Sequence, residues 1–299
     1  ALVPSTDVTI WGSFDIEYAF AGGNGGQPIK TSSGWVANEG AGVNGHARIT
    51  CHGGKIGEIF GGSDFRGIVR KATTTQAQQG TCPLRITKLY GAGKEADVDG
   101  DVNVVISGCT AENSEIEYVC GGSYKANISG NVHLTITAGY FQNVYGGNDQ
   151  RGSIGGNIIV DIEETDPCKP IIINNLVGGG NQANFPGKKN DVELPEKDPR
   201  RTITVNVKSA TYIGNVYGGS FKAETKANTF VNVNMIHGNH AGQSRVLPAD
   251  FGMENAKIPE NIKSVTTSYV AVSPTPSEGT SVVGYYTKSG DDYIPASIS

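Results

Sequence analysis

The sequence predicts an all-β fold, a right-handed parallel β-helix (β-solenoid) of about seven coils with a C-terminal β-hairpin cap or module. Two observations lead to it. Glycine makes up 42 of the 299 residues, about double its usual share, and the accompanying Asn, Thr, Val and Ile residues favour short strands joined by tight turns. A seven-residue pattern also recurs along most of the chain, which is typical of folds that bury one core between stacked repeats.

The repeated pattern reads apolar, two small or polar residues, apolar, aromatic, Gly, Gly. Residues 213–219 (IGNVYGG), 141–147 (FQNVYGG) and 56–62 (IGEIFGG) carry it in full. Variants with a changed slot occupy residues 16–22, 86–92, 116–122 and 173–179. The copies follow one another at intervals of 25 to 40 residues. A 25-residue unit is too short for the four-stranded blade of a β-propeller, so the spacing favours a solenoid.

A second strand is expected before most copies of the pattern, because apolar and polar residues alternate there and give a strand one buried face. These strands are expected at residues 47–51, 102–106, 132–136, 158–162 and 203–207. In the shortest repeat, residues 121–145, a further extended piece at 124–128 would complete one coil of three strands. Stacking in register would let Asn, Ser and Thr form ladders between coils.

Longer segments follow three of the Gly-Gly corners, at residues 22–44, 63–84 and 181–201. The first is rich in glycine, the second is interpreted as a flexible insertion, and the third is charged. Insertions at one corner of a solenoid project from the same side. These segments therefore either wall a groove or are tolerated surface loops.

Both ends of a solenoid expose strand edges that need covering. Residues 8–14 are expected to cap the N-terminal end. The repeat is lost after about residue 240, where residues 282–286 and 292–294 around a turn predict a β-hairpin. We therefore divide the chain into a β-solenoid with its N-terminal cap, residues 1–240, and a C-terminal cap or small β module, residues 241–299.

The aromatic slot of the pattern supplies candidate ligand-binding residues. It holds Phe20, Phe60, Tyr90, Tyr145 and Tyr217. Strict alternation along the strand would turn these rings outward, where they could stack on sugar faces. A bend at the corner would instead make them core, and this arrangement is the favoured one.

Basic residues soon after the Gly-Gly corners are a second candidate set. Arg66, Lys94, Arg151 and Lys222 share this position. Stacking could bring them into one basic column that recognises an acidic glycan. The alternative is ordinary surface charge.

Alternate carboxylates at Asp97, Asp99 and Asp101 resemble a calcium loop, because such groups converge on hard cations. The same segment aligns with residues 127–131 and 153–157, which carry Asn, Ser and Gly in those places. A structural turn is therefore the favoured interpretation and a calcium site the alternative. No other cofactor is predicted.

Acidic residues also gather at the end of one expected strand, at Asp161, Glu163, Glu164 and Asp166. Two of them could act as acid and base in glycoside cleavage, or the group could be a solvated loop.

Charge and hydropathy exclude some functions. The formal net charge is −5 and no long basic run occurs, so nucleic-acid binding is not expected. No apolar run approaches the ~20 residues of a membrane-spanning helix. The five cysteines are scattered and are expected to be mostly small buried hydrophobes.

The Val/Ile-Tyr-Gly-Gly corners and Gly-Asn-Val strands of residues 12–236 resemble glycine-rich parallel β-helix proteins that bacteria, notably gut Bacteroidetes, secrete or display. The resemblance implies a pectin-lyase-like fold, an extracellular or cell-surface location, and a role as an adhesin with a glycan or host-surface partner. Pectate lyases add a calcium-binding acidic cluster and a basic catalytic residue, which do not map onto this sequence.

The sequence thus predicts a non-catalytic β-solenoid for adhesion or glycan binding. A polysaccharide lyase or glycoside hydrolase acting in a groove is the alternative, and a structural spacer is a third reading. Solenoids host many activities, so fold does not decide among them.

Overall fold

The computed structural model describes residues 2–25, 29–36, 41–107, 115–165, 169–186, 201–233, 286–289 and 292–295. The chain divides into two compact units, Ala1–Met235 and Ile236–Ser299. Every regular element assigned within the described residues is a β-strand. The predicted all-β class is therefore confirmed.

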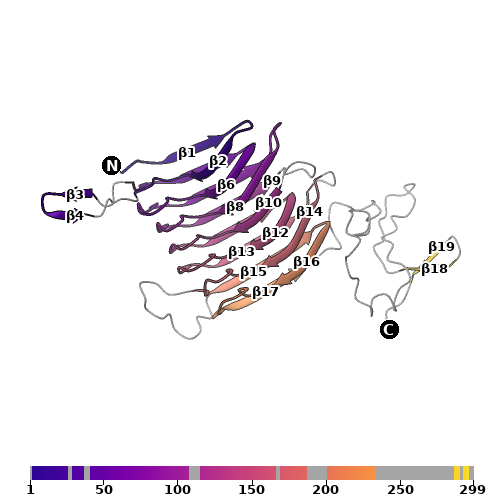
Figure 1. Ribbon diagram of the computed structural model, residues 1–299. Coiled ribbons are helices and arrows are strands. Elements are labelled where there is room, and N and C mark those ends of the chain that lie inside the picture. Colours follow the sequence, from indigo (N-terminus) through magenta and orange to yellow (C-terminus); the bar gives the residue numbers. More distant parts are fainter. Residues whose placement is uncertain are drawn as a thin grey trace. The chain divides into compact units, whose positions relative to one another are not determined.

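The first unit contains two parallel sheets whose strands alternate along the chain (Figure 1). The eight-stranded sheet has the order β1 (Thr6–Ile10), β5 (Ala47–Cys51), β7 (Thr73–Gln78), β9 (Val102–Ser107), β11 (Val132–Ile136), β13 (Ile158–Glu163), β15 (Thr202–Ser209) and β17 (Asn228–Val233). The seven-stranded sheet has the order β2 (Asp15–Phe20), β6 (Gly54–Phe60), β8 (Leu84–Tyr90), β10 (Glu115–Cys120), β12 (Gly139–Tyr145), β14 (Ile171–Val177) and β16 (Tyr212–Tyr217). Each repeat therefore gives one strand to each sheet, and neither sheet closes on itself.

A third line of contact runs through the repeats. Isolated parallel bridges join Val3, Val43, Val69, Val98, Ile128 and Ile154 in series, each to the next. We call this line the bridge column. It lies in each repeat between the Gly-Gly corner and the next strand of the eight-stranded sheet. The expected strand at 124–128 is thus a single bridging residue, Ile128, because the corner before it bends the backbone.

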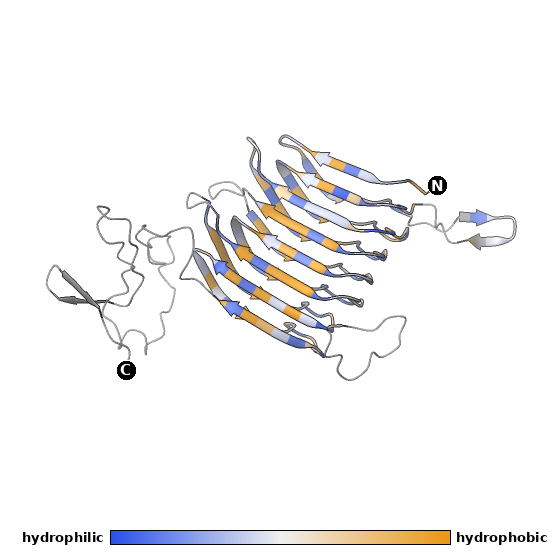
Figure 2. Ribbon diagram, turned by 180° about the vertical axis from the view of Figure 1, so that it is seen from behind, coloured by the Kyte–Doolittle hydropathy of each residue, from blue (hydrophilic) through white to orange (hydrophobic). Residues whose placement is uncertain are grey.

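The core lies between the sheets, where the alternating apolar residues point. In β11, Val132, Leu134 and Ile136 are buried while His133 and Thr135 are partly exposed. The register keeps residues of one kind in line, so that Leu134 pairs with Val104 on one side and Val160 on the other. Figure 2 shows the resulting alternation of hydrophobic and hydrophilic residues along the strands.

The first glycine of each corner is required by close packing between repeats. A Cβ on Gly61 would overlap the carbonyl oxygen of Gly91, and one on Gly91 would overlap that of Gly121. Gly121 and Gly146 meet the following corner in the same way. The Gly-Gly pair therefore lets successive corners stack at strand spacing.

Two sequence interpretations are wrong. Residues 63–84 are not a flexible insertion, because they contain β7, a full strand in which Thr73 and Thr75 point into the core and donate hydrogen bonds to the Gly91 carbonyl (2.9 and 3.3 Å). Residues 8–14 are not a cap, because Thr6–Ile10 is the first strand of the eight-stranded sheet. The sequence pattern does not reveal β7, because Thr73 and Thr75 take inward positions that are apolar in other strands. Residues 8–14 suggested a cap because they lie at one end of the repeats.

The other segments are described in part. Residues 22–44 contain a small hairpin, β3 (Ile29–Thr31) and β4 (Gly34–Val36). Residues 187–200 of the third segment lie outside the described residues. In the second unit, β18 (Tyr286–Ser289) pairs antiparallel with β19 (Asp292–Pro295). A hairpin is therefore present with its second strand as predicted, but its first strand is 286–289 instead of 282–286, and residues 282–285 lie outside the described residues.

Three cysteines lie in the described residues, and all three are free. Cys51 and Cys120 are buried, as expected of small hydrophobes. Burial raises the pKa of the Cys51 thiol to about 12, so that thiol is unreactive near neutral pH.

Candidate functional site

A groove follows the outer side of the bridge column. Its floor is the line of buried bridging residues Val98, Ile128 and Ile154. Its walls are the residues immediately before and after them, which face outward because side chains alternate in extended backbone. The walls therefore repeat at ~4.8 Å, the spacing of neighbouring strands.

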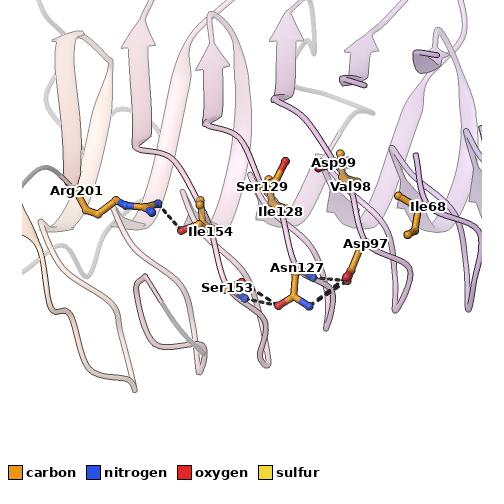
Figure 3. Close-up of a pocket in the computed structure, with 11 residues that line it drawn as sticks. Ile68, Asp97, Val98, Asp99, Asn127, Ile128, Ser129, Ser153, Ile154 and Arg201 are labelled. Carbon is orange, nitrogen blue, oxygen red and sulfur yellow. Dashed lines mark hydrogen bonds between the residues drawn. The ribbon is translucent and has the colours of Figure 1, made fainter. Parts of the chain in front are cut away.

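One part of this groove is a pocket of about 340 Å³ (Figure 3). Asp97 and Asp99 flank Val98, and Asn127 and Ser129 flank Ile128. Arg201 closes the pocket and donates a hydrogen bond from Nη1 to the Ile154 carbonyl (3.1 Å). Carboxylate, amide, hydroxyl and guanidinium groups thus line an apolar floor.

A second pocket of about 450 Å³ continues the groove toward the first repeat. It shares Ile68 and Asp97 with the first pocket and adds Arg66, Arg70 and Glu95 among its walls. Phe65 and Ile68 are 44% and 41% exposed here. The Arg66 guanidinium lies 5.8 Å from the centre of the Phe65 ring, so one cation and one aromatic face are presented together.

Side-chain ladders fix the groove walls. Asp97 Oδ1 accepts a hydrogen bond from the Asn127 backbone N–H (2.8 Å), and Asn127 Oδ1 accepts one from the Ser153 N–H (2.9 Å). A second ladder runs alongside the first, in which Asp101 Oδ1 accepts a hydrogen bond from the Asn131 backbone N–H (2.7 Å). Such ladders hold each wall residue to its neighbour and confirm the expected stacking of Asn and Ser.

These ladders also bear on the proposed calcium loop. The carboxylates of Asp97 and Asp101 accept hydrogen bonds from the next repeat, while Asp99 is exposed in the pocket wall. No group of three or more His, Cys, Asp or Glu suited to a metal ion occurs among the described residues. The structural-turn interpretation accounts for two of the three carboxylates, and calcium binding stays a prediction.

The rings of the aromatic slot stack on one another in a column separate from the main core. Phe60 and Tyr90 lie 4.8 Å apart with 3° between their planes. Phe60, Tyr90 and Tyr145 are buried, whereas Tyr217 in the last copy is 43% exposed. Phe60, Tyr90 and Tyr145 are thus packed, Phe20 is partly exposed and stacks on Phe60 (4.9 Å), and Tyr217 offers a face to solvent.

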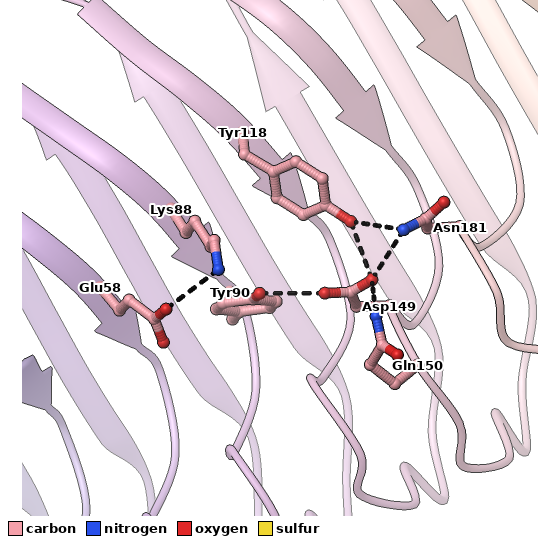
Figure 4. Close-up of polar contacts among 7 residues, drawn as sticks. All are labelled: Glu58, Lys88, Tyr90, Tyr118, Asp149, Gln150 and Asn181. Carbon is pink, nitrogen blue, oxygen red and sulfur yellow. Dashed lines mark hydrogen bonds and ion pairs between the residues drawn. The ribbon is translucent and has the colours of Figure 1, made fainter.

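A buried polar cluster interrupts this ring column (Figure 4). Asp149 is 4% exposed and accepts hydrogen bonds from the hydroxyls of Tyr90 (3.0 Å) and Tyr118 (2.8 Å) and from Asn181 Nδ2 (2.9 Å). The pKa of both tyrosines is raised above the ordinary value of 10, mainly by burial and next by the neighbouring Cys120 and Asp149. The hydroxyls therefore stay protonated and donate.

One sequence feature points to this cluster. Cys120 occupies the aromatic slot in its repeat, and a thiol is smaller than a ring. The space beside it is where Tyr118, Tyr90 and Asp149 meet. Tyr90 and Asp149 are buried and Tyr118 and Asn181 are partly exposed, so the cluster forms a joint between repeats that reaches the surface.

The basic candidates do not form one column. The backbone N–H of Lys125 donates to the Lys94 carbonyl of the repeat before it. The backbone N–H of Lys222 donates instead to the Asn181 carbonyl. Lys94 and Lys222 therefore lie in different rows of the stack. Arg66 lines the groove, while Arg151 and Lys222 are exposed. Lys94 pairs with Asp64 (3.5 Å) instead of adding to a positive stripe.

The acidic candidates lie among other partners. Asp161 accepts hydrogen bonds from His133 Nε2 (2.7 Å) and Asn206 Nδ2 (2.8 Å). Burial opposes its charge, but the Asn206 and His133 hydrogen bonds outweigh burial and lower the pKa of Asp161 below 3.8. Glu163 pairs with Lys208 (2.8 Å), and buried Glu164 accepts from the Ile171 N–H (2.9 Å). Asp166 lies outside the described residues.

Comparison with known family models, with curated proteins and with solved structures found no match. Among the described residues there is no helix long and apolar enough to cross a membrane.

Proposed function

We propose that this chain is a right-handed parallel β-helix that binds an extended glycan, without catalysis, outside the cell or on a bacterial surface. The observation that carries the proposal is the continuous groove along the bridge column. Two pockets, of about 340 and 450 Å³, share Ile68 and Asp97 and so form one depression.

The repeat geometry supports the β-helix. Strands of one sheet pair in parallel with strands of neighbouring repeats, in register except for a shift at the end of β13, and the bridge column adds a third side. A chain that visits two sheets and one bridge in every repeat follows a helical path. Each coil leaves its apolar side chains to be covered by the next coil.

The groove chemistry supports a polyhydroxylated ligand. Sugar hydroxyls need both donors and acceptors, which Arg66, Arg70, Asp99 and Ser129 supply. The apolar faces of sugar rings need flat or branched apolar contacts, which Phe65 and Ile68 supply. A wall that repeats along the stack suits a polymer better than a single compact molecule.

The carboxylates support a non-catalytic role. A general acid needs a raised pKa near the working pH, whereas the pKa of Asp161 is lowered. Glu163 is paired with Lys208 and Glu164 with backbone and Thr211. A polysaccharide lyase or hydrolase remains the alternative function, with a groove as its active site.

Binding by groove variants tests the proposal. A polysaccharide that the wild-type chain binds is titrated with the Arg66→Ala and Asp99→Ala variants. Each variant is expected to bind it about tenfold more weakly than wild type, since a hydrogen bond to a charged group contributes roughly 1.5–3 kcal/mol. Arg48→Ala is the matched control, because Arg48 is exposed on β5 outside both pockets. Unchanged affinity in both groove variants would contradict the proposed site.

A further inference from the structure

Two arginines of one repeat line the second pocket of the groove. Arg66 and Arg70 share this pocket of about 450 Å³ with the apolar side chains of Phe65 and Ile68. Arg66 is partly buried and Arg70 is exposed. Within the described part of the chain, neither guanidinium forms an ion pair or a hydrogen bond. Two uncompensated positive charges therefore meet at one pocket.

The other charged residues of this pocket have partners elsewhere. Glu95 Oε1 lies 3.6 Å from Lys125 Nζ. Asp97 accepts hydrogen bonds from the backbone N–H (2.8 Å) and from Nδ2 (3.2 Å) of Asn127 (Figure 3). Both carboxylates thus bind groups of the next repeat, so they leave the two guanidinium groups available to a ligand.

The backbone that carries the two arginines is held firmly by the repeat before it. Gly67, which follows Arg66, has a φ of +99°, and a Cβ there would lie 2.5 Å from the Ala41 carbonyl oxygen. The Arg70 backbone N–H donates a hydrogen bond to the Val43 carbonyl (2.9 Å). Because this backbone is already ordered, only the arginine side chains need to be ordered when a ligand binds.

A corner of the same kind occurs later in the chain without the pair of arginines. Arg151, like Arg66, stands before a glycine in the left-handed region, with φ of +101° and +99° respectively. The residue after the buried bridging residue is Gly155 in that repeat, where the earlier repeat has Arg70. Arg151 is exposed and lines neither pocket. The chain therefore contains a matched control for Arg66.

Given the proposed glycan binding, on which this step rests, we propose that the glycan is an acidic polysaccharide. The pocket lined by Arg66 and Arg70, the arginine pocket, holds one of its anionic groups, a carboxylate or a sulfate. A guanidinium group donates parallel hydrogen bonds to two oxygens of such a group. The sugar that carries it packs on Phe65 and Ile68. Asp99, exposed in the wall of the first pocket, accepts hydrogen bonds from hydroxyls further along the polymer.

Polysaccharides that differ only in charge test this assignment. Hyaluronan and chondroitin, each with free carboxylates and as the methyl ester, are titrated into the whole chain in a calorimeter, together with chondroitin sulfate and the neutral polymers xylan, glucan and mannan. At least one anionic form is expected to bind about tenfold more tightly than its uncharged counterpart, and to lose this advantage as salt is raised. An advantage of free carboxylate over ester identifies a carboxylate, and one of chondroitin sulfate over chondroitin identifies a sulfate.

Two results would overturn the assignment and are distinguishable from each other. Equal binding of charged and uncharged forms, or binding of neutral polymers alone, would contradict an anionic ligand and leave the proposed glycan binding intact. Binding of no polymer at all would contradict the proposed function, and the acidic ligand with it.

Variants then test the residues. Arg66→Gln/Arg70→Gln removes both charges and is expected to abolish the preference for the anionic form, whereas Arg151→Gln is expected to keep it. Arg70→Gln alone repeats the test at an exposed side chain, in case the double variant does not fold, and is expected to reduce the preference. An unchanged preference in the double variant or in Arg70→Gln, or an equal loss in Arg151→Gln, would overturn the role of the arginine pocket.

Discussion

At the scale of single residues, the first glycine of each corner is required because neighbouring repeats contact each other closely there. A Cβ on Gly91 would meet the Gly121 carbonyl and the Val104 and Val102 side chains. Ala92, the next residue, is buried and tolerated in a slot that other copies fill with glycine. The second glycine is also closely packed in other copies, since a Cβ on Gly62 would lie 2.7 Å from the Gly93 backbone nitrogen.

Gly91→Ala is therefore expected to lower the free energy of unfolding by about 3 kcal/mol, as overpacking against backbone does. Gly219→Ala is the control, because the nearest atom to its Cβ is the movable Thr225 hydroxyl at 3.1 Å, and about 1 kcal/mol or less is expected there. Urea unfolding of both variants measures the difference. Equal losses would show that the corner packing is misjudged.

Asp161 gives the stability a pH dependence on the acid side. Its pKa is lower in the folded chain than the ordinary 3.8, so ionised Asp161 stabilises the fold above that value. This contribution is lost as the pH falls through the lower, folded-state pKa. Asp161→Asn is expected to lower the free energy of unfolding by about 1 kcal/mol at neutral pH. In a plot of that free energy against pH, the variant should show a smaller decrease on the acid side (the acid limb). An acid limb identical to wild type would count against the assignment.

At the scale of elements, the corner loops are joined by side chains as well as by backbone. Asp149 links the ends of β8 and β10 to the following corner through Tyr90, Tyr118 and Asn181. The Asp149 carboxylate thus joins its own repeat to three others. The loss of Asp149 would leave the buried Tyr90 hydroxyl without this acceptor.

Asp149→Ala is expected to destabilise the fold by about 3 kcal/mol, because it removes the acceptor of the buried Tyr90 hydroxyl, of the partly buried Tyr118 hydroxyl and of Asn181 Nδ2. Tyr145→Phe is the control, since it removes a ring hydroxyl of the same column that is not bonded to Asp149, and about 1 kcal/mol or less is expected. Thermal unfolding followed by near-ultraviolet circular dichroism reads both stability and ring packing. Equal effects would show that Asp149 does not organise the cluster.

Strands with apolar alternation could be predicted element by element. Residues 47–51 and 132–136 are strands with the expected bounds. β7 was missed because Thr73 and Thr75 take inward positions that are apolar elsewhere, and their hydrogen bonds to Gly91 are long-range contacts. The groove could be predicted in part, since residues 65–70 of the segment 63–84 line it, but its run past Asp97 and Ser129 depends on which residues the register sets side by side.

At the scale of the whole molecule, stability should fall from the centre of the stack to its ends. Val104 is buried with neighbours on both sides, whereas Val231 lies on the outermost strand and is 42% exposed. Val104→Ala is expected to cost about 2–3 kcal/mol and Val231→Ala less than about 1 kcal/mol. Urea denaturation measures both. A larger loss at Val231 would contradict an open final repeat.

The central claim is that this chain binds glycan without cleaving it. The most direct measurement incubates the whole chain with a panel of plant, host and microbial polysaccharides, with and without calcium, and reads bound protein and new oligosaccharides by mass spectrometry. We expect retention on at least one polysaccharide and no products under either condition. Depolymerisation of any member of the panel, or no retention on any of them, would contradict the claim.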